Sequence, residues 1–86
     1  MTYKQRMQAK LTEAFSPVML DIIDESEAHR GHGGYQEGGE THFKITIKAA
    51  AFNGLSRVAQ QRAVMAAVKA ELDERVHALA LEVSGV

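Results

Sequence analysis

The chain has 86 residues, a net charge of −1 and a hydrophobic content of 45%. This length predicts one domain over residues 1–86, with the composition of an ordinary globular protein. No apolar run approaches the ~18–20 residues that a membrane span needs. The first ten residues lack the apolar region of a secretion signal, so we expect a cytoplasmic location. The sequence contains no cysteine, which excludes disulfides and thiolate metal sites within the chain and leaves histidine as its strong nitrogen ligand.

The N-terminal segment, residues 2–15, has the periodicity of an amphipathic helix. Large apolar residues recur at every fourth position: Tyr3, Met7, Leu11 and Phe15. Thr2 can cap the start of this helix. Ser16-Pro17 ends it, because proline disfavours a helical conformation in the residue before it.

Two strands are predicted next, with a long loop between them. Residues 18–24, "VMLDIID", suit a strand. Residues 41–48, "THFKITIK", alternate with a period of two, so one face of this strand is buried. The acidic, glycine-rich stretch 25–40 joins them in a predicted antiparallel hairpin. A hairpin loop longer than the usual length of about 2–5 residues is often functional.

The second half of the chain predicts a turn, a helix and a third strand. Asn53-Gly54 is a turn signal and Ser56 is a helix cap. Residues 57–73 are predicted to form the longest helix, with a break near its start. The apolar stripe of this helix contains Val58, Val64 or Met65, Val68 and Leu72. Residues 75–83 alternate again, and His77 shares the side of Leu79, Leu81 and Val83.

The predicted order is therefore α-β-β-α-β, which places the chain in the α+β class. The final strand–helix–strand crossover favours parallel pairing of its two strands. We expect a three-stranded mixed sheet with helices on one face.

Histidine is the most informative residue type in this sequence. Three of the four histidines lie in the loop and the strand after it, and glycines flank His32 on both sides. His29 and His32 are metal-ligand candidates, with solvated loop residues as the alternative. His77 is either a metal or interface residue or a partly buried histidine at the start of the last strand. His42 is expected to be a solvent-facing strand residue.

Other motifs are less specific. "GHGG", residues 31–34, matches the GxxG of KH domains, but it lies between two strands rather than between two helices. We find no phosphate-binding loop and no nucleophile with a placed base, so we do not expect an enzyme. Arg57, Arg62 and Lys69 on the long helix suit an exposed face, a nucleic-acid contact or an acidic partner.

One ordered set of motifs resembles a known family. "DES", "GGETHFKI", "FNGLSR", "AEL" and "VHALAL" follow one another as they do in the BolA family, over about residues 4 to 83. "ETHFK" and "VHALAL" are the specific parts. Many members carry Arg-His-Arg where this chain has Gln60-Gln61-Arg62, so a contact made by that histidine does not transfer.

The resemblance implies a fold, a partner and a cofactor. The fold is α-β-β-α-β with a short extra helix, like the type II KH topology. The partner is a monothiol glutaredoxin, which with glutathione supplies thiolates to a shared 2Fe–2S cluster. The BolA-type chain supplies His77, which matches the family's "VHAL", and a loop residue, which is His29 or His32. The glycines beside His32 favour that histidine because they permit close backbone approach.

Two other functions stay open on the sequence. The family is also credited with DNA-binding transcriptional regulation, for which Arg57, Arg62 and Lys69 would be the contacts. The net charge of −1 argues mildly against this role, since affinity for DNA comes largely from neutralising phosphates. An interaction module without metal is the third reading. We expect the isolated chain to be a monomer that holds no cluster alone.

Overall fold

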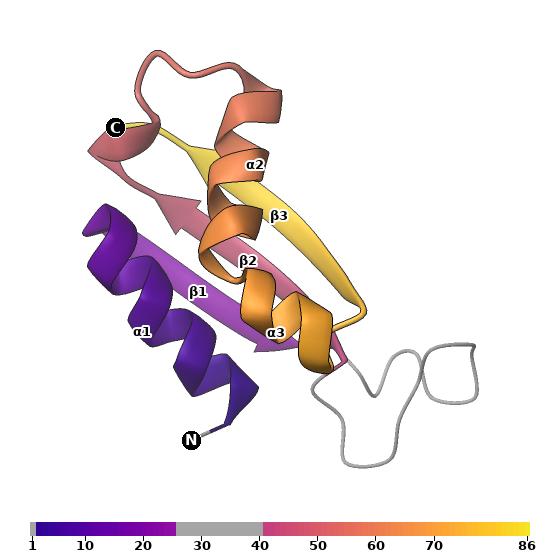
Figure 1. Ribbon diagram of the computed structural model, residues 1–86. Helices are drawn as coiled ribbons and strands as arrows, with labels where there is room; N and C mark the ends of the chain where they lie inside the picture. Colours follow the sequence, from indigo (N-terminus) through magenta and orange to yellow (C-terminus); the bar gives the residue numbers. More distant parts are fainter. Residues whose placement is uncertain (1, 26–40) are drawn as a thin grey trace.

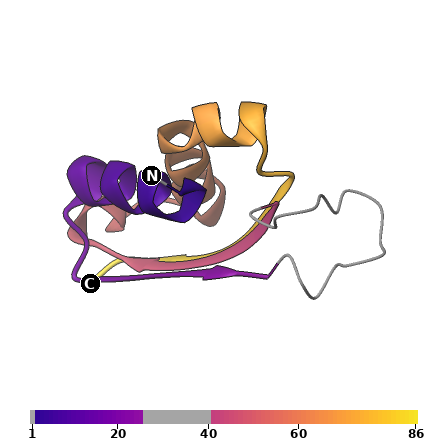
Figure 2. The same cartoon turned by 90° about the horizontal axis from the view of Figure 1, so that it is seen from below.

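The computed structural model describes residues 2–25 and 41–86, which form one sheet and a layer of helices (Figure 1). The sheet has three strands in the order β1-β2-β3. All helices lie on one face of it, and the other face is uncovered by any described segment (Figure 2). The predicted α+β class, mixed sheet and single helical layer are thus confirmed, whereas the likeness to the type II KH topology stays a prediction.

Helix α1 spans Tyr3–Phe15 and forms as its sequence predicts. The Thr2 hydroxyl accepts from the Gln5 backbone, and the Gln5 side chain accepts from the Thr2 backbone, which completes a capping box. At the other end, Ser16 adopts a left-handed conformation with φ of 45° before Pro17, and its N–H donates to the Thr12 carbonyl. The buried residues of α1 are Met7 and Leu11, four positions apart on one stripe.

The sheet combines an antiparallel and a parallel pair. Strand β1 (Met19–Asp24) pairs antiparallel with β2 (His42–Lys48), and β2 pairs parallel with β3 (Ala78–Ser84). The inward side chains of β2, Phe43, Ile45 and Ile47, are fully or almost fully buried. The polar residues between them face the uncovered side, which explains the alternation in this strand. Val18, predicted as the first residue of β1, lies outside it and is 70% exposed.

The connection from β2 to β3 contains three short helices instead of one long one. These are η2 (Ala50–Phe52), α2 (Arg57–Ala67) and α3 (Lys69–Glu74). The prediction of one helix over residues 57–73 was wrong in two respects. The longest helix is α1, and the break falls at Val68, whose φ of −112° and ψ of 22° leave the helical region. This change of direction lets α3 contact α1.

The apolar stripe of α2 also differs from the predicted one. Val64 and Val68 are fully buried, whereas Val58 is 58% exposed and Met65 is exposed. Val58 lies in the first turn, where α2 has not yet reached the centre of the core. The choice between Val64 and Met65 is settled in favour of Val64. In the described residues, every helix is too short or too polar to cross a membrane.

Candidate functional site

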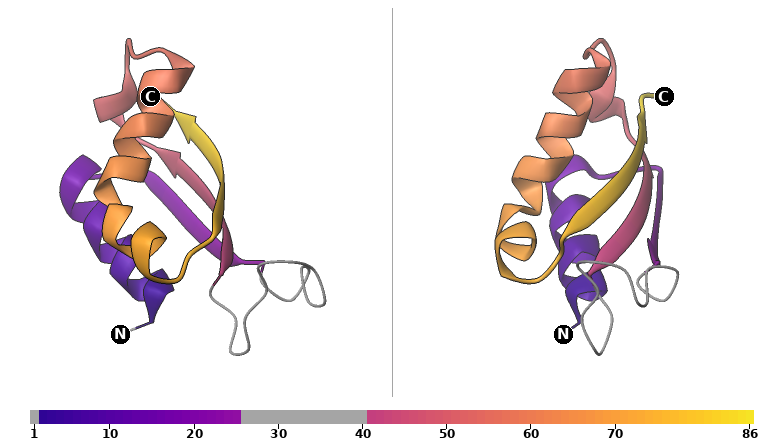
Figure 3. Two further views of the ribbon diagram at one scale, coloured as in Figure 1. Left: turned by 45° about the vertical axis from the view of Figure 1, so that its right-hand side comes forward. Right: turned by 90° about the vertical axis from the view of Figure 1, so that its right-hand side faces the viewer.

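The end of β1 and the starts of β2 and β3 meet at one end of the sheet, next to α3 (Figure 3). The register places His42 opposite Ala78, so His42 and His77 come from neighbouring strand starts. The Glu25 N–H donates to the His42 carbonyl at 2.7 Å, which ties the end of β1 to the same place. Residues that are far apart in the sequence are thus brought together by the parallel pairing of β2 and β3.

His77 presents an exposed imidazole from a firmly held backbone. Its N–H donates to the Thr41 carbonyl at 2.7 Å, and the N–H of Ala78 donates to the same oxygen at 3.2 Å. Val76, the residue before it, is buried and donates its N–H to the Glu71 carbonyl at 3.0 Å. The prediction that His77 lies inside the strand was wrong, because β3 begins one residue later, and of the two alternatives for its side chain the structure excludes partial burial. A fixed backbone with an exposed ring suits a ligand or an interface residue.

Sequence reasoning did not identify His42 as a neighbour of His77. The centroids of the His42 and His77 rings are 6.4 Å apart. His42 is half-buried rather than solvent-facing, and its Nδ1 lies 2.8 Å from the hydroxyl of the buried Thr41. A hydroxyl partner on one ring nitrogen fixes the orientation of an imidazole. The sequence did contain a signal for this proximity. The dipeptides Thr41-His42 and Val76-His77 both stand at the starts of strands that were expected to pair in parallel.

The two predicted loop ligands, His29 and His32, lie outside the described residues. Within residues 2–25 and 41–86, no group of three histidine, cysteine or acidic side chains could hold a metal ion. The described part therefore offers imidazoles at this end of the sheet but no complete ligand set. Such a donor set fits a 2Fe–2S cluster whose other ligands come from elsewhere, because imidazole replaces thiolate on one iron of Rieske-type clusters.

Glu71 links α1 to the segment that leads to His77. Its side chain is 0% exposed and accepts from Lys10 Nζ at 2.7 Å and from Arg6 Nε at 3.1 Å. Its backbone carbonyl accepts from the N–H groups of Arg75 and Val76. A buried carboxylate with charged donors on both oxygens is fully satisfied. The position of α3, and with it the turn before His77, therefore depends on these ion pairs.

Glu74 extends the same network at the surface. Arg6 Nη2 donates to Glu74 Oε2 at 2.8 Å, and the Tyr3 hydroxyl donates to Oε1 at 3.2 Å. The Arg6 guanidinium also stacks 4.6 Å from the centre of the Tyr3 ring. The hydrogen bonds from Arg6 hold the pKa of Glu74 below its ordinary value of 4.5, and the same contact raises the pKa of Arg6.

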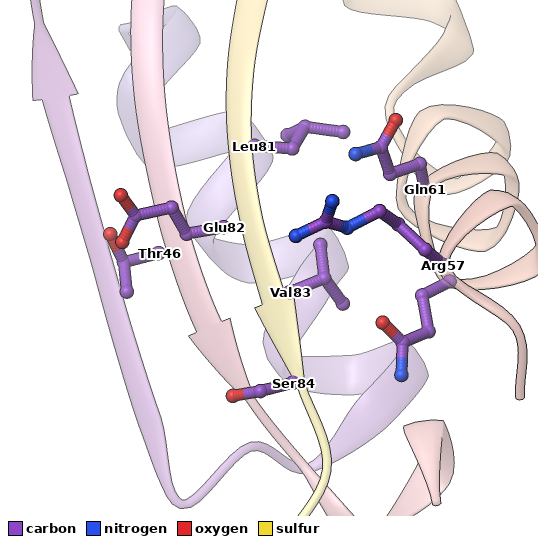
Figure 4. Close-up of a pocket in the computed structure, with 8 residues that line it drawn as sticks. Thr46, Arg57, Gln61, Leu81, Glu82, Val83 and Ser84 are labelled. Atoms are coloured by element: carbon purple, nitrogen blue, oxygen red, sulfur yellow. The ribbon is translucent and has the colours of Figure 1, made fainter. Parts of the chain in front are cut away.

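The three basic residues named for nucleic acid are not gathered into one stripe. Lys69 Nζ pairs with Asp73 at 2.7 Å on α3. Arg57 stands in the first turn of α2 and points toward β3 (Figure 4). Arg62 follows five residues later, about 140° around a helix of 3.6 residues per turn. The three side chains therefore do not track one phosphate backbone.

Comparison with known proteins agrees with this architecture. A family model for BolA-like proteins matches residues 11–85. The chain is 45% identical over 83 residues to a Sinorhizobium sp protein described as an uncharacterized protein in cobS 5′region, covering 95% of this chain and 89% of that protein. It is 36% identical over 81 residues to the DNA-binding transcriptional regulator BolA of Escherichia coli (strain K12), covering 94% and 73% of the two chains.

A solved structure shows the same fold. BolA1 from Arabidopsis thaliana superposes with a TM-score of 0.86 at 30% sequence identity, covering 99% of this chain and 93% of that one. The matched region includes both ends of the sheet and all the described helices. On the family match and these likenesses together, the chain belongs to the BolA family.

Proposed function

We propose that this chain is an adaptor that binds a monothiol glutaredoxin and shares a 2Fe–2S cluster with it, in cluster trafficking or iron and redox regulation. The observation that carries the proposal is the exposed His77 imidazole on a backbone fixed by Thr41, in a BolA-family chain that has no cysteine. Glutaredoxin and glutathione would supply thiolates, and this chain would supply His77 and one of His29 and His32. The chain acts here as a ligand donor and a binding partner, not as an enzyme.

The arrangement accounts for what each residue does. Thr41 holds the backbone of His77 through its carbonyl and orients His42 through its hydroxyl. When bound, a cluster with two imidazole ligands has a higher reduction potential than one held by four thiolates.

Single histidine-to-alanine variants test this assignment. The chain and a monothiol glutaredoxin are purified together without oxygen, and the complex is followed by iron content and visible circular dichroism. His77→Ala should abolish the Rieske-like signature, and so should one of His29→Ala and His32→Ala. His42→Ala is the matched control and should keep the signature, because the proposed ligands from this chain are His77 and one of the two loop histidines. An unchanged spectrum for His77→Ala would overturn the proposal.

A DNA-binding regulator is the second candidate, favoured by the printed name of the Escherichia coli relative. Binding would use Arg57, Arg62 and Lys69. The separation of these side chains and the Lys69–Asp73 ion pair weigh against it. The test is a shift of a promoter fragment by the isolated chain, with an affinity that falls as salt rises. Loss of that shift in Arg57→Gln and Arg62→Gln would support DNA binding.

A further inference from the structure

Strand β3 has an open edge. In the described residues it pairs with β2 alone. The Ala78 N–H donates to the Thr41 carbonyl and the Ser84 carbonyl accepts from the Ala49 N–H, so the even-numbered residues of β3 direct their peptide groups toward the β2 side. Successive residues of a strand alternate, so Leu79, Leu81 and Val83 direct their N–H and C=O groups toward the open edge.

In its own sequence, strand β3 lacks the usual protections against pairing. Edge strands are normally blunted by lysine, proline, a bulge or short length. β3 is seven residues long, with the sequence "ALALEVS", and contains neither lysine nor proline. Its one charged residue, Glu82, lies 3.6 Å from Lys44 Nζ on β2. The edge is therefore a ready template for another strand.

A pocket of about 350 Å³ lies beside this edge, between β3 and the start of α2. Half-buried Leu81 and Val83 line it from the strand, and Arg57 and Gln61 line it from the helix (Figure 4). An extended segment paired with β3 would place every second side chain in this pocket. The edge of β3 can thus bind the backbone of an added strand, and the pocket beside it can bind side chains of that strand.

The helix side of the pocket is positively charged. Arg57 has no ion-pair or hydrogen-bond partner among the described residues, and the first turn of α2 contains no acidic residue. The positive end of the α2 dipole therefore adds to the charge of Arg57. Glu82 also lines the pocket, but its carboxylate lies across β3 from Arg57 and beside Thr46 (Figure 4). An acidic side chain of a segment bound at this edge would therefore be attracted by Arg57 on the α2 side of the pocket and not by the Glu82 side.

We propose that the edge of β3 binds an extended segment of a partner protein, which adds a fourth strand and places an acidic side chain against Arg57. Backbone hydrogen bonds to Leu79, Leu81 and Val83 would supply affinity, and the Arg57 contact would supply specificity. The residues of β3 that line the pocket, Leu81 to Ser84, follow His77 by four to seven residues, roughly 13 to 23 Å at the rise of a strand. The inference is thus independent of the cluster proposed at the other end of β3.

Selection from a displayed library of random octapeptides tests the proposal without a known partner. The full chain should enrich sequences of alternating β-branched residues with an aspartate or glutamate at one fixed position. The charge-reversed variant Arg57→Glu should select lysine or arginine at that same position. The matched variant Arg62→Glu, on another side of α2, should select the same peptides as the unchanged chain. No acidic preference, or an identical selection by Arg57→Glu, would overturn the proposal.

A synthetic peptide from that selection then locates the binding surface. Hydrogen exchange should slow at the amides of Leu79, Leu81 and Val83, and Arg57→Gln should weaken binding about tenfold, the loss of one charge-assisted hydrogen bond. Val83→Pro removes one outward N–H near the strand end and should also weaken binding. The same three amides could already exchange slowly in the absence of peptide, and sedimentation could show a dimer. Together these results would show that a second copy of the chain occupies the edge. That result, or equal competition by a DNA oligonucleotide, would contradict the proposal.

Discussion

Glu71 is the fully buried charged side chain of the described residues. It is a carboxylate with no exposed surface, and its partners Arg6 and Lys10 both come from α1. We expect Glu71→Gln to lower the free energy of unfolding by about 1–3 kcal/mol, since hydrogen bonds to a charged group are lost in a buried site. Urea unfolding measures this difference.

Glu13→Gln provides the matched control. Glu13 lies on the same helix as Arg6 and Lys10 but is exposed. This variant should unfold within about 0.5 kcal/mol of the unchanged chain, as surface substitutions usually do. Equal losses for Glu71→Gln and Glu13→Gln would show that the buried ion pairs contribute nothing.

Glu74 makes a surface contact whose contribution to stability depends on pH. Its pKa in the folded chain lies below the ordinary 4.5, because Arg6 donates to it. The contact therefore stabilises the fold above that pH, and the contribution is lost as the pH falls through the lower folded value. Urea unfolding from neutral pH to about pH 3 should show a smaller acid loss for Glu74→Gln than for the unchanged chain. Parallel curves would contradict this assignment.

At the scale of elements, local sequence signals explain where helices α1 and α2 begin. The Ser56 hydroxyl accepts from the Ala59 N–H at 3.1 Å and caps α2, as predicted. We expect Ser56→Ala to cost about 1 kcal/mol in the free energy of unfolding and Ser56→Gly only a few tenths. Thermal or urea unfolding distinguishes the two variants. A loss for glycine as large as for alanine would show that the cap is not the cause.

The break between α2 and α3 could not be predicted from periodicity. The stripe of Val64, Val68 and Leu72 continues across it with helical spacing. The break at Val68 accompanies a contact between α3 and α1, where Glu71 meets Arg6 and Lys10. A signal that depends on a helix more than 60 residues earlier in the chain is invisible in a short window.

At the scale of the whole molecule, the sequence predicted the sheet, whereas the ligand role of His77 stays a prediction. The alternation of apolar and polar residues in β2 and the strand–helix–strand connection after it were enough to predict the strand order and the parallel pairing of β2 with β3. The proximity of His42 to His77 needed the exact register, which places His42 opposite Ala78. Strand alternation alone put His77 inside β3, because it cannot tell the last loop residue from the first strand residue.

The two ends of β3 offer different chemistry. The exposed His77 stands at the start of the strand, and the open edge runs from there to the pocket beside Arg57 at the far end. If both proposals hold, a cluster-bearing partner and an extended segment would bind at different parts of the strand. The reversed peptide selection expected of Arg57→Glu should therefore leave the cluster signature of the glutaredoxin complex unchanged.

The central claim is that nitrogen from this chain ligates a cluster held with a glutaredoxin. Pulsed electron paramagnetic resonance of the reduced complex tests it directly, with this chain labelled with 15N and the glutaredoxin unlabelled. We predict 15N couplings from two coordinated imidazoles, one of which disappears in His77→Ala. A complex that holds its cluster with no 15N coupling, or with couplings unchanged in His77→Ala, would contradict the account.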